Sequence, residues 1–175
     1  MTCLVSELLT SPTELFAARL RQMLWVELQL SEEVLHEFCE QAHAIYLQWA
    51  FQRHLLETER HVTCLRTILY EREVPAEPEE SPAFKGLVQE HEQLVEQLPL
   101  GDPLLRDLAH AHAAAMTELL EVAAYQSLTS LAETLGERAI AILLREVLEQ
   151  EKLAFEEFER ATARLSSQTV VGSRP

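Results

Sequence analysis

The stretch from Thr13 to Glu73 contains no Gly and no Pro, and it is rich in Leu, Ala, Glu, Gln and Arg. These residues are good helix formers, so the sequence predicts α-helix along the whole stretch. A single helix of about 60 residues would be about 90 Å long, which is too long for one compact domain. We therefore expect the chain to fold back on itself, with a tight turn near Cys39–Ala44.

The other helix boundaries follow from the positions of Pro and Gly. Ser11, Pro12 and Glu14 have the spacing of a capping box and predict a helix start. Asp102 with Pro103 predicts another start, because Asp caps a helix well and Pro fits its first turn. The remaining expectations are a linker at Val74–Ser81, a short helix at 82–97, a break at Leu98–Asp102, a helix to about Leu135 followed by Gly136, a helix at 137–165, and a flexible tail at 166–175.

These boundaries predict an all-α protein in which residues 1–165 form a single domain. The four main helices form two hairpins, and a crossover of about 30 residues that contains a short helix joins the hairpins. One long crossover between two hairpins is the connectivity of ferritin-like four-helix bundles. A β-sandwich is disfavoured because aromatic residues make up only 6% of the chain and there are only four Gly.

The net charge of the chain limits the kinds of partner that it can bind. Lys and Arg number 14 against 29 Asp and Glu, so the formal net charge is −15. Such a surface repels phosphate backbones and anionic bilayers, so we expect neither a nucleic acid nor a membrane partner. Residues 1–10 lack the pattern of a signal peptide, and the three Cys include no Cys-x-x-Cys motif. Both observations predict a cytoplasmic protein without disulfides.

Glutamates interrupt the apolar stripe of every main helix near its middle. Residues at positions i, i+3, i+4 and i+7 share one face of a helix, and we call this face the stripe. On each main helix the stripe contains one inward Glu and no Lys or Arg. A buried carboxylate must be neutralised, paired or bound to a metal, because an unpaired buried charge is very costly. The interrupting residues are Glu27, Glu57, Glu118 and Glu151, and Glu121 lies one turn beyond Glu118.

Histidine completes the pattern of a metal site. His61 lies one turn from Glu57, and we interpret His54 as either a ligand or a hydrogen-bonding partner of one. Four inward carboxylates with a nearby imidazole match the ligands of two oxygen-loving transition metals in a bundle core. The alternatives are boundary glutamates and ordinary core histidines. Tyr125 is interpreted as a core residue, with a hydrogen bond to a site carboxylate as the alternative. The other five histidines are interpreted as surface or packing residues: His36, His43, His91, His110 and His112.

Several segments resemble the YciE/YciF-type ferritin-like family, whose members are linked to stress response. The resemblance covers roughly residues 11–164. The segments that carry it are His54-Leu55-Leu56-Glu57-Thr58-Glu59-Arg60-His61, Lys85-Gly86-Leu87-Val88, Arg106-Asp107, Glu118-Leu119-Leu120-Glu121-Val122-Ala123-Ala124-Tyr125, Leu131-Ala132-Glu133-Thr134-Leu135-Gly136 and Leu148-Glu149-Gln150-Glu151-Lys152.

The resemblance implies a rubrerythrin-like bundle with a carboxylate-bridged di-iron centre, two irons per chain, with Mn or Zn as alternatives. It implies metal ligation by Glu27, Glu57, Glu118, Glu121 and Glu151, and it places His61 where the family often has Gln. Leu119 and Phe155 depart from the family pattern, which has His and Asp there. These departures leave occupancy by two metals, one metal or none open.

Two classes of function follow. The first is a di-iron oxidoreductase with ferroxidase-like activity, in which Fe(II) reacts with dioxygen or peroxide during stress response. The second is a non-catalytic helical interaction module that has lost a working metal site. We also expect a homodimer, with Trp49 and Phe51 contributing to its interface because both lie off the site stripe.

Overall fold

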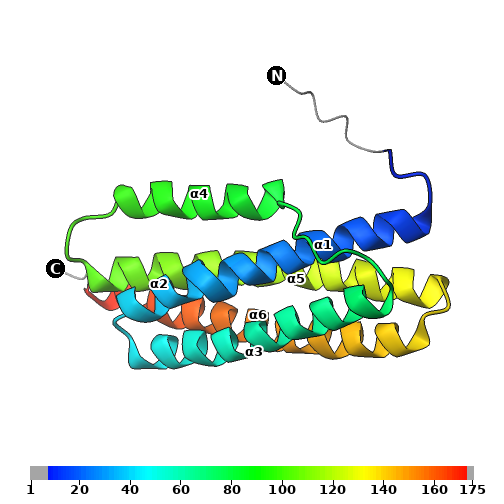
Figure 1. Cartoon of the computed structure of the whole chain (residues 1–175). Coiled ribbons are helices and arrows are strands. Elements are labelled where there is room, and N and C mark those ends of the chain that lie inside the picture. The colour runs from blue at the N-terminus through cyan, green and yellow to red at the C-terminus, as the bar shows by residue number, and fades with distance from the viewer. Residues whose placement is uncertain (1–7, 173–175) are drawn as a thin grey trace, which may run out of the picture.

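A computed structural model describes residues 8–172 of the chain. All regular structure in this range is helical, as the sequence predicts (Figure 1). The elements in chain order are α1 (Pro12–Gln29), the π-helical turn η1 (Leu30–Val34), α2 (Leu35–Gln41), α3 (Ile45–Glu71), α4 (Pro82–Glu96), α5 (Pro103–Thr134) and α6 (Arg138–Gly172).

The expected helix ends are present. The Ser11 hydroxyl accepts a hydrogen bond from the Glu14 amide at 3.2 Å, and the Glu14 carboxylate accepts one from the Ser11 amide at 3.2 Å. Asp102 caps α5 by accepting a hydrogen bond from the Leu105 amide at 3.1 Å. Gly136 has φ of +79°, a left-handed conformation that ends a helix at no steric cost to Gly. These caps confirm the boundaries predicted from Ser, Asp and Gly.

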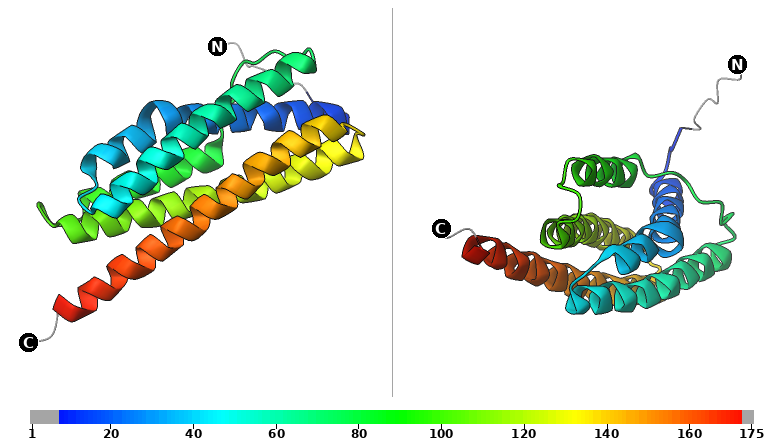
Figure 2. Two further views of the ribbon diagram at one scale, coloured as in Figure 1. Left: turned by 90° about the horizontal axis from the view of Figure 1, so that it is seen from below. Right: turned by 90° about the vertical axis from the view of Figure 1, so that its left-hand side faces the viewer.

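Four long helical rods form the bundle, and α1, η1 and α2 together make the first of them (Figures 1 and 2). This rod and α3 form one hairpin, while α5 and α6 form the second. The crossover between the hairpins carries α4, which lies along α5 at the side of the bundle (Figure 2). The predicted ferritin-like four-helix bundle is therefore confirmed.

The first rod contains a π-helical turn that the stripe analysis did not predict. The Leu35 amide donates to the Leu30 carbonyl, five residues back, and this bond inserts one extra residue into the turn. Regular helical spacing from Leu30 would place Val34 inward, but Val34 is only half-buried and the inward position moves to Leu35, which is buried. Next to this turn, the Ser31 hydroxyl donates to the Glu27 carbonyl at 2.7 Å. The irregular turn thus begins three residues after Glu27, a predicted site residue.

The last helix is longer than expected. It was predicted to end near Leu165, but α6 continues to Gly172, so most of the predicted flexible tail is helical. Ser and Thr hydroxyls donate back to carbonyls of the preceding turn, as Ser166 does to the Thr162 carbonyl at 2.8 Å. The helix continues because no Pro or Gly lies between Gly136 and Gly172. Residues 173–175 lie outside the described range, as do residues 1–7 with Cys3.

One residue that was expected at a dimer interface lies in the core instead. Phe51 is fully buried and stacks on Phe158 with ring centroids 5.2 Å apart, so its predicted place in a dimer interface is wrong. Phe51 lies off the traced stripe of α3 but is still buried, because α3 faces the core over a wider arc than that stripe. Trp49 is 66% exposed, so its predicted place in a dimer interface stays a prediction. Cys39 and Cys64 are free thiols. No helix within residues 8–172 is long and apolar enough to cross a membrane.

Candidate metal centre

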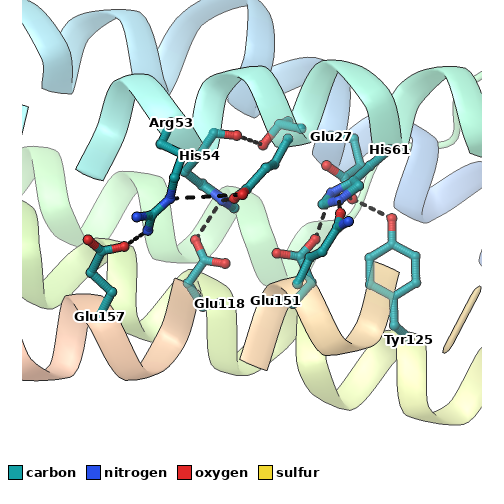
Figure 3. A network of polar contacts seen from close by, with 11 residues as sticks. Glu27, Arg53, His54, His61, Glu118, Tyr125, Glu151 and Glu157 are labelled. Atoms are coloured by element: carbon teal, nitrogen blue, oxygen red, sulfur yellow. Dashed lines mark hydrogen bonds and ion pairs between the residues drawn. The ribbon is translucent and has the colours of Figure 1, made fainter. Parts of the chain in front are cut away.

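Six of the seven predicted site residues come together in the middle of the bundle. Each of the four rods contributes, because each turns its polar mid-length position inward (Figure 3). All six side chains are buried. They are Glu27 from α1, His54 and His61 from α3, Glu118 and Glu121 from α5, and Glu151 from α6.

The six residues form two overlapping groups that share Glu151. In the first group, one ligand atom from each of four residues lies within 4.8 Å of the others, and the members are His54, Glu118, Glu121 and Glu151. The second group meets the same limit with Glu27, His61 and Glu151. A carboxylate has two oxygens, so a shared glutamate can serve two adjacent ions. The arrangement therefore offers two neighbouring cation positions.

The bond geometry inside the groups suits ligands of a common ion better than hydrogen bonds. His54 Nε2 lies 2.9 Å from a Glu118 oxygen, and His61 Nδ1 lies 2.9 Å from a Glu151 oxygen. Despite these distances, both imidazole nitrogens lack a hydrogen-bond partner of acceptable geometry. Adjacent ligands at about 2.1 Å from a transition metal are about 3 Å apart. The two close pairs have this separation.

Unpartnered oxygens give a second observation in favour of a metal. Both carboxylate oxygens of Glu121 and of Glu151 are buried without a hydrogen bond, as is one oxygen each of Glu27 and Glu118. Native proteins leave few buried polar atoms unsatisfied, so six such oxygens in one place need an explanation. Carboxylate and imidazole ligands suit Mn, Fe and Zn, and the donor set fits such ions.

Burial and mutual contact shift the pKa values of these groups in opposite directions. Burial raises the pKa of Glu118 to about 8 and that of Glu121 well above its usual range. Burial alone would lower the pKa of His61, but the carboxylates of Glu27 and Glu151 outweigh it and raise the value to about 11. Without metal, protons on the imidazoles and on some of the carboxyls thus balance the site charge.

Tyr125 closes one end of the site. Its hydroxyl donates a hydrogen bond to an oxygen of Glu27 (Figure 3). The ring is fully buried and lies 6.3 Å from the His61 ring in an edge-on arrangement. The sequence analysis gave this hydrogen bond as the alternative to a plain core tyrosine. The structure shows both roles together.

Gln150 is a site neighbour that the sequence analysis missed. Its side-chain oxygen lies 2.7 Å from Nε2 of His61. A glutamine oxygen only accepts, so the Nε2 atom of His61 carries a proton and donates it. Metal binding requires the neutral ring, and the lone pair of Nδ1 in that ring then faces Glu27 and Glu151, at 3.5 and 2.9 Å. Gln150 lies off the α6 stripe, so helical spacing gives no signal for it.

Glu57 is the predicted site residue that the structure does not bring into either group. Its side chain is 24% exposed, with one oxygen 3.8 Å from His54 Nδ1 and the other 3.9 Å from Arg53 Nε. Arg53 also pairs with Glu157 on α6. The buried residue between the two histidines is Thr58, whose hydroxyl donates to the His54 carbonyl at 3.0 Å.

Helical geometry explains why Glu57, and not Thr58, was predicted to point inward. Both positions lie about 50° from the line through His54 and His61, on opposite sides of it. Which side faces the core depends on how α3 packs against its neighbours, and periodicity does not contain this information.

The two departures from the family pattern lie outside both ligand groups. Leu119 is 48% exposed, so the side chain at this position points away from the core. Phe155 is half-buried and belongs to neither ligand group. The six buried ligand candidates therefore assemble without a His at 119 or an Asp at 155.

Comparisons with known proteins agree with this fold and site. The family model described as "Domain of unknown function (DUF892)" matches residues 11–170. Protein YciF of Escherichia coli (strain K12) is 35% identical over 107 residues, which make up 61% of this chain and 63% of YciF. That alignment thus spans less than two-thirds of the relative.

Two solved structures have the same fold. The crystal structure of the Escherichia coli stress protein YciF superposes with a TM-score of 0.83 at 27% identity, covering 91% of this chain and 99% of YciF. YcfI of Rhodopseudomonas palustris superposes with a TM-score of 0.83 at 26% identity, covering 88% and 96% of the two chains. The chain therefore belongs to the DUF892 family, which confirms its resemblance to the YciE/YciF-type proteins.

Proposed function

We propose that this protein binds two metal ions, iron in the first place, between its four helical rods and uses them for redox chemistry with dioxygen or peroxide. The observation that carries the proposal is the pair of buried ligand groups that share Glu151. The unpartnered carboxylate oxygens and the 2.9 Å imidazole–carboxylate separations support it. The similarity to a protein described as a stress protein supports a role in stress response.

The residues divide the task between the two positions. His54, Glu118 and Glu121 would hold one ion, Glu27 and His61 the other, and Glu151 would contact both. Bound iron supplies one-electron transfer to an oxidant, which the side chains cannot supply themselves. The surrounding apolar core excludes water and strengthens the interaction of the carboxylates with cations. Tyr125 keeps Glu27 in place by its hydrogen bond.

The reaction is tested with protein loaded anaerobically with Fe(II). Mixing with hydrogen peroxide or with air-saturated buffer, followed by ultraviolet absorbance in a stopped-flow instrument, measures the rate of Fe(III) formation. We expect oxidation well above the rate of free Fe(II), and we expect Glu151→Gln to abolish the difference. Equal rates for wild-type protein and for Fe(II) in buffer would contradict the proposal. Repeating the assay with Glu59→Gln, an exposed position on α3, controls for the loss of one charge.

The second candidate function is a non-catalytic helical interaction module. The observation that favours it is the absence of Glu57 from the ligand groups, which leaves α3 with two histidines and no carboxylate there. This candidate predicts the same melting temperature with and without metal, because no ligand stabilises the native state. A metal-dependent rise in the melting temperature would exclude it.

Four further assignments are part of this proposal. Residues 1–165 are taken as one domain, and the protein is taken to be a cytoplasmic homodimer whose partners are metal ions and a small oxidant. Manganese and zinc remain the alternative metals, since the same donor set suits them. Anaerobic loading with each metal in turn, followed by competition with iron, decides among them.

A further inference from the structure

The crossover helix α4 covers the bundle incompletely. Of its residues only Phe84 is fully buried, while Leu87 and Val88 are half-buried. Its neighbour α5 presents small side chains such as Ala113 towards it, and small residues leave space beneath a helix. A cavity of about 270 Å³ lies between α2, α4 and α5. None of the six candidate metal ligands lines it.

The walls of this cavity are mostly apolar. Phe38 of α2 and Val88 and Val95 of α4 form its sides, and Thr117 of α5 adds a hydroxyl. Pockets for small molecules commonly combine apolar walls with a few polar groups, and they measure about 300–1,000 Å³ for drug-sized ligands. This cavity is slightly smaller, so it suits a short-chain molecule and not a peptide segment.

The polar groups of the cavity carry one sign of charge. Glu37, Glu92 and Glu96 line it at exposed positions, and no Lys or Arg does. Among the described residues, no Lys or Arg pairs with these three carboxylates either. A cation at the rim would therefore be attracted by three carboxylates, while an anion there would be repelled.

A histidine pair lies at the same place without adding positive charge. Nε2 of His91, which lines the cavity, is 3.1 Å from Nδ1 of His110, and His91 Nδ1 is buried without a hydrogen-bond partner. Burial lowers the pKa of His91, so its ring is neutral near pH 7. His91 Nδ1 is available for a hydrogen bond with a polar group that enters the cavity.

We infer that this cavity is a second ligand site, which binds a small organic ammonium ion with a short aliphatic chain. The chain lies against Phe38, Val88 and Val95, and the ammonium group lies at the rim formed by Glu37, Glu92 and Glu96. Selective binding needs both parts of the cavity. The apolar walls favour any short aliphatic chain, and the carboxylates select the cation among molecules of equal length.

Binding of three probes of the same chain length tests the inference. Hexylammonium, hexanol and hexanoate are titrated into the full-length protein, and affinity is measured by calorimetry and by amide shifts in NMR spectra. We expect hexylammonium to bind at least about tenfold more tightly than hexanol, with hexanoate weaker still. The largest amide shifts are expected in α2, α4 and α5. Hexanol or hexanoate binding as tightly as hexylammonium would overturn the inference.

Two variants locate the site. Glu92→Gln combined with Glu96→Gln changes only exposed side chains, so the fold is retained, and it should remove the preference for hexylammonium over hexanol. Glu156→Gln combined with Glu159→Gln, on α6 and away from the cavity, should leave that preference intact. Val88→Trp fills the cavity and should abolish binding of all three probes. Unchanged binding of hexylammonium to both the Glu92/Glu96 and the Val88 variants would refute the assignment.

Discussion

The Tyr125 hydroxyl of α5 donates a hydrogen bond to the Glu27 carboxylate of α1 inside the bundle core. This buried polar contact joins the two hairpins. Replacement of Tyr125 by Phe leaves a buried carboxylate oxygen with one partner fewer. Loss of such a partner costs about 1–3 kcal/mol, so Tyr125→Phe should lower the free energy of unfolding by that amount. Urea denaturation of the metal-free protein measures it.

Tyr70 provides the matched control for this prediction, since it is 84% exposed at the end of α3. Tyr70→Phe removes the same hydroxyl from a solvated position and should change the free energy of unfolding by less than about 0.5 kcal/mol. Equal stability of the two variants would show that the Tyr125–Glu27 contact contributes nothing.

Asp107 of α5 holds the turn between α2 and α3. One of its oxygens accepts from the His43 amide at 2.8 Å and the other from the Ala44 amide at 2.7 Å. Ala44 is the N-cap residue of α3 and has no side chain that can cap, so Asp107 replaces the missing cap from a distant helix. Hydrogen bonds to charged groups contribute about 1.5–3 kcal/mol each.

Asp107→Ala should therefore destabilise the protein by about 3 kcal/mol or more, because both amides lose their acceptor. Asp107→Asn keeps one acceptor oxygen and should fall between wild type and Asp107→Ala. Chemical denaturation gives the three stabilities, and hydrogen exchange at the His43 and Ala44 amides gives the local effect. An Asp107→Ala protein as stable as wild type would contradict this reading of the turn.

His110 is expected to make stability depend on pH. Burial lowers its pKa to about 3, below the ordinary value of 6.5, so the folded protein holds it neutral while the unfolded chain binds a proton. Its contribution is complete above about pH 6.5 and decreases as the pH falls towards 3, by up to about 1.4 kcal/mol per pH unit. The neighbouring His91 and Arg106 side chains also oppose protonation of His110.

The comparison of two variants isolates this effect from the titration of the carboxylates. His110→Gln should lose stability less steeply than wild type between pH 6.5 and 4.5, while His112→Gln, at an exposed position, should follow the wild-type curve. Parallel curves for all three proteins would mean that His110 is not held neutral.

Gln150 is expected to orient His61 for metal binding. Gln150→Leu removes the acceptor of the His61 Nε2 proton, and loss of such a partner typically costs 10- to about 100-fold in metal affinity. Gln126→Leu, an exposed position on α5, serves as the control. Competition titration with a chromophoric chelator measures both affinities. An unchanged affinity in Gln150→Leu would contradict a role for this hydrogen bond.

The fold and most of the site could be predicted from the sequence because both depend on local signals. Ser11, Asp102 and Gly136 mark helix ends through their own chemistry, and the inward glutamates stand out against apolar stripes. Features that depend on tertiary packing could not be predicted. The choice of Thr58 over Glu57 depends on which side of α3 meets its neighbours.

Two further features, an irregular helical turn and a contact between distant segments, are not revealed by periodicity. The π-helical turn moves the inward position from Val34 to Leu35 and breaks the spacing on which the stripe depends. The pairing of His91 with His110 joins the crossover to the bundle across 19 residues. Neither residue has a neighbour in sequence that signals the contact.

Metal content per chain after anaerobic loading and gel filtration, measured by mass spectrometry for wild type and three variants, tests whether two ions share Glu151. The account predicts two ions per chain for wild type, one for His61→Ala, one for Glu121→Gln, and fewer than one for Glu151→Gln, because Glu151 belongs to both ligand groups. Fewer than one ion per wild-type chain, or the same content in wild type and Glu151→Gln, would contradict it.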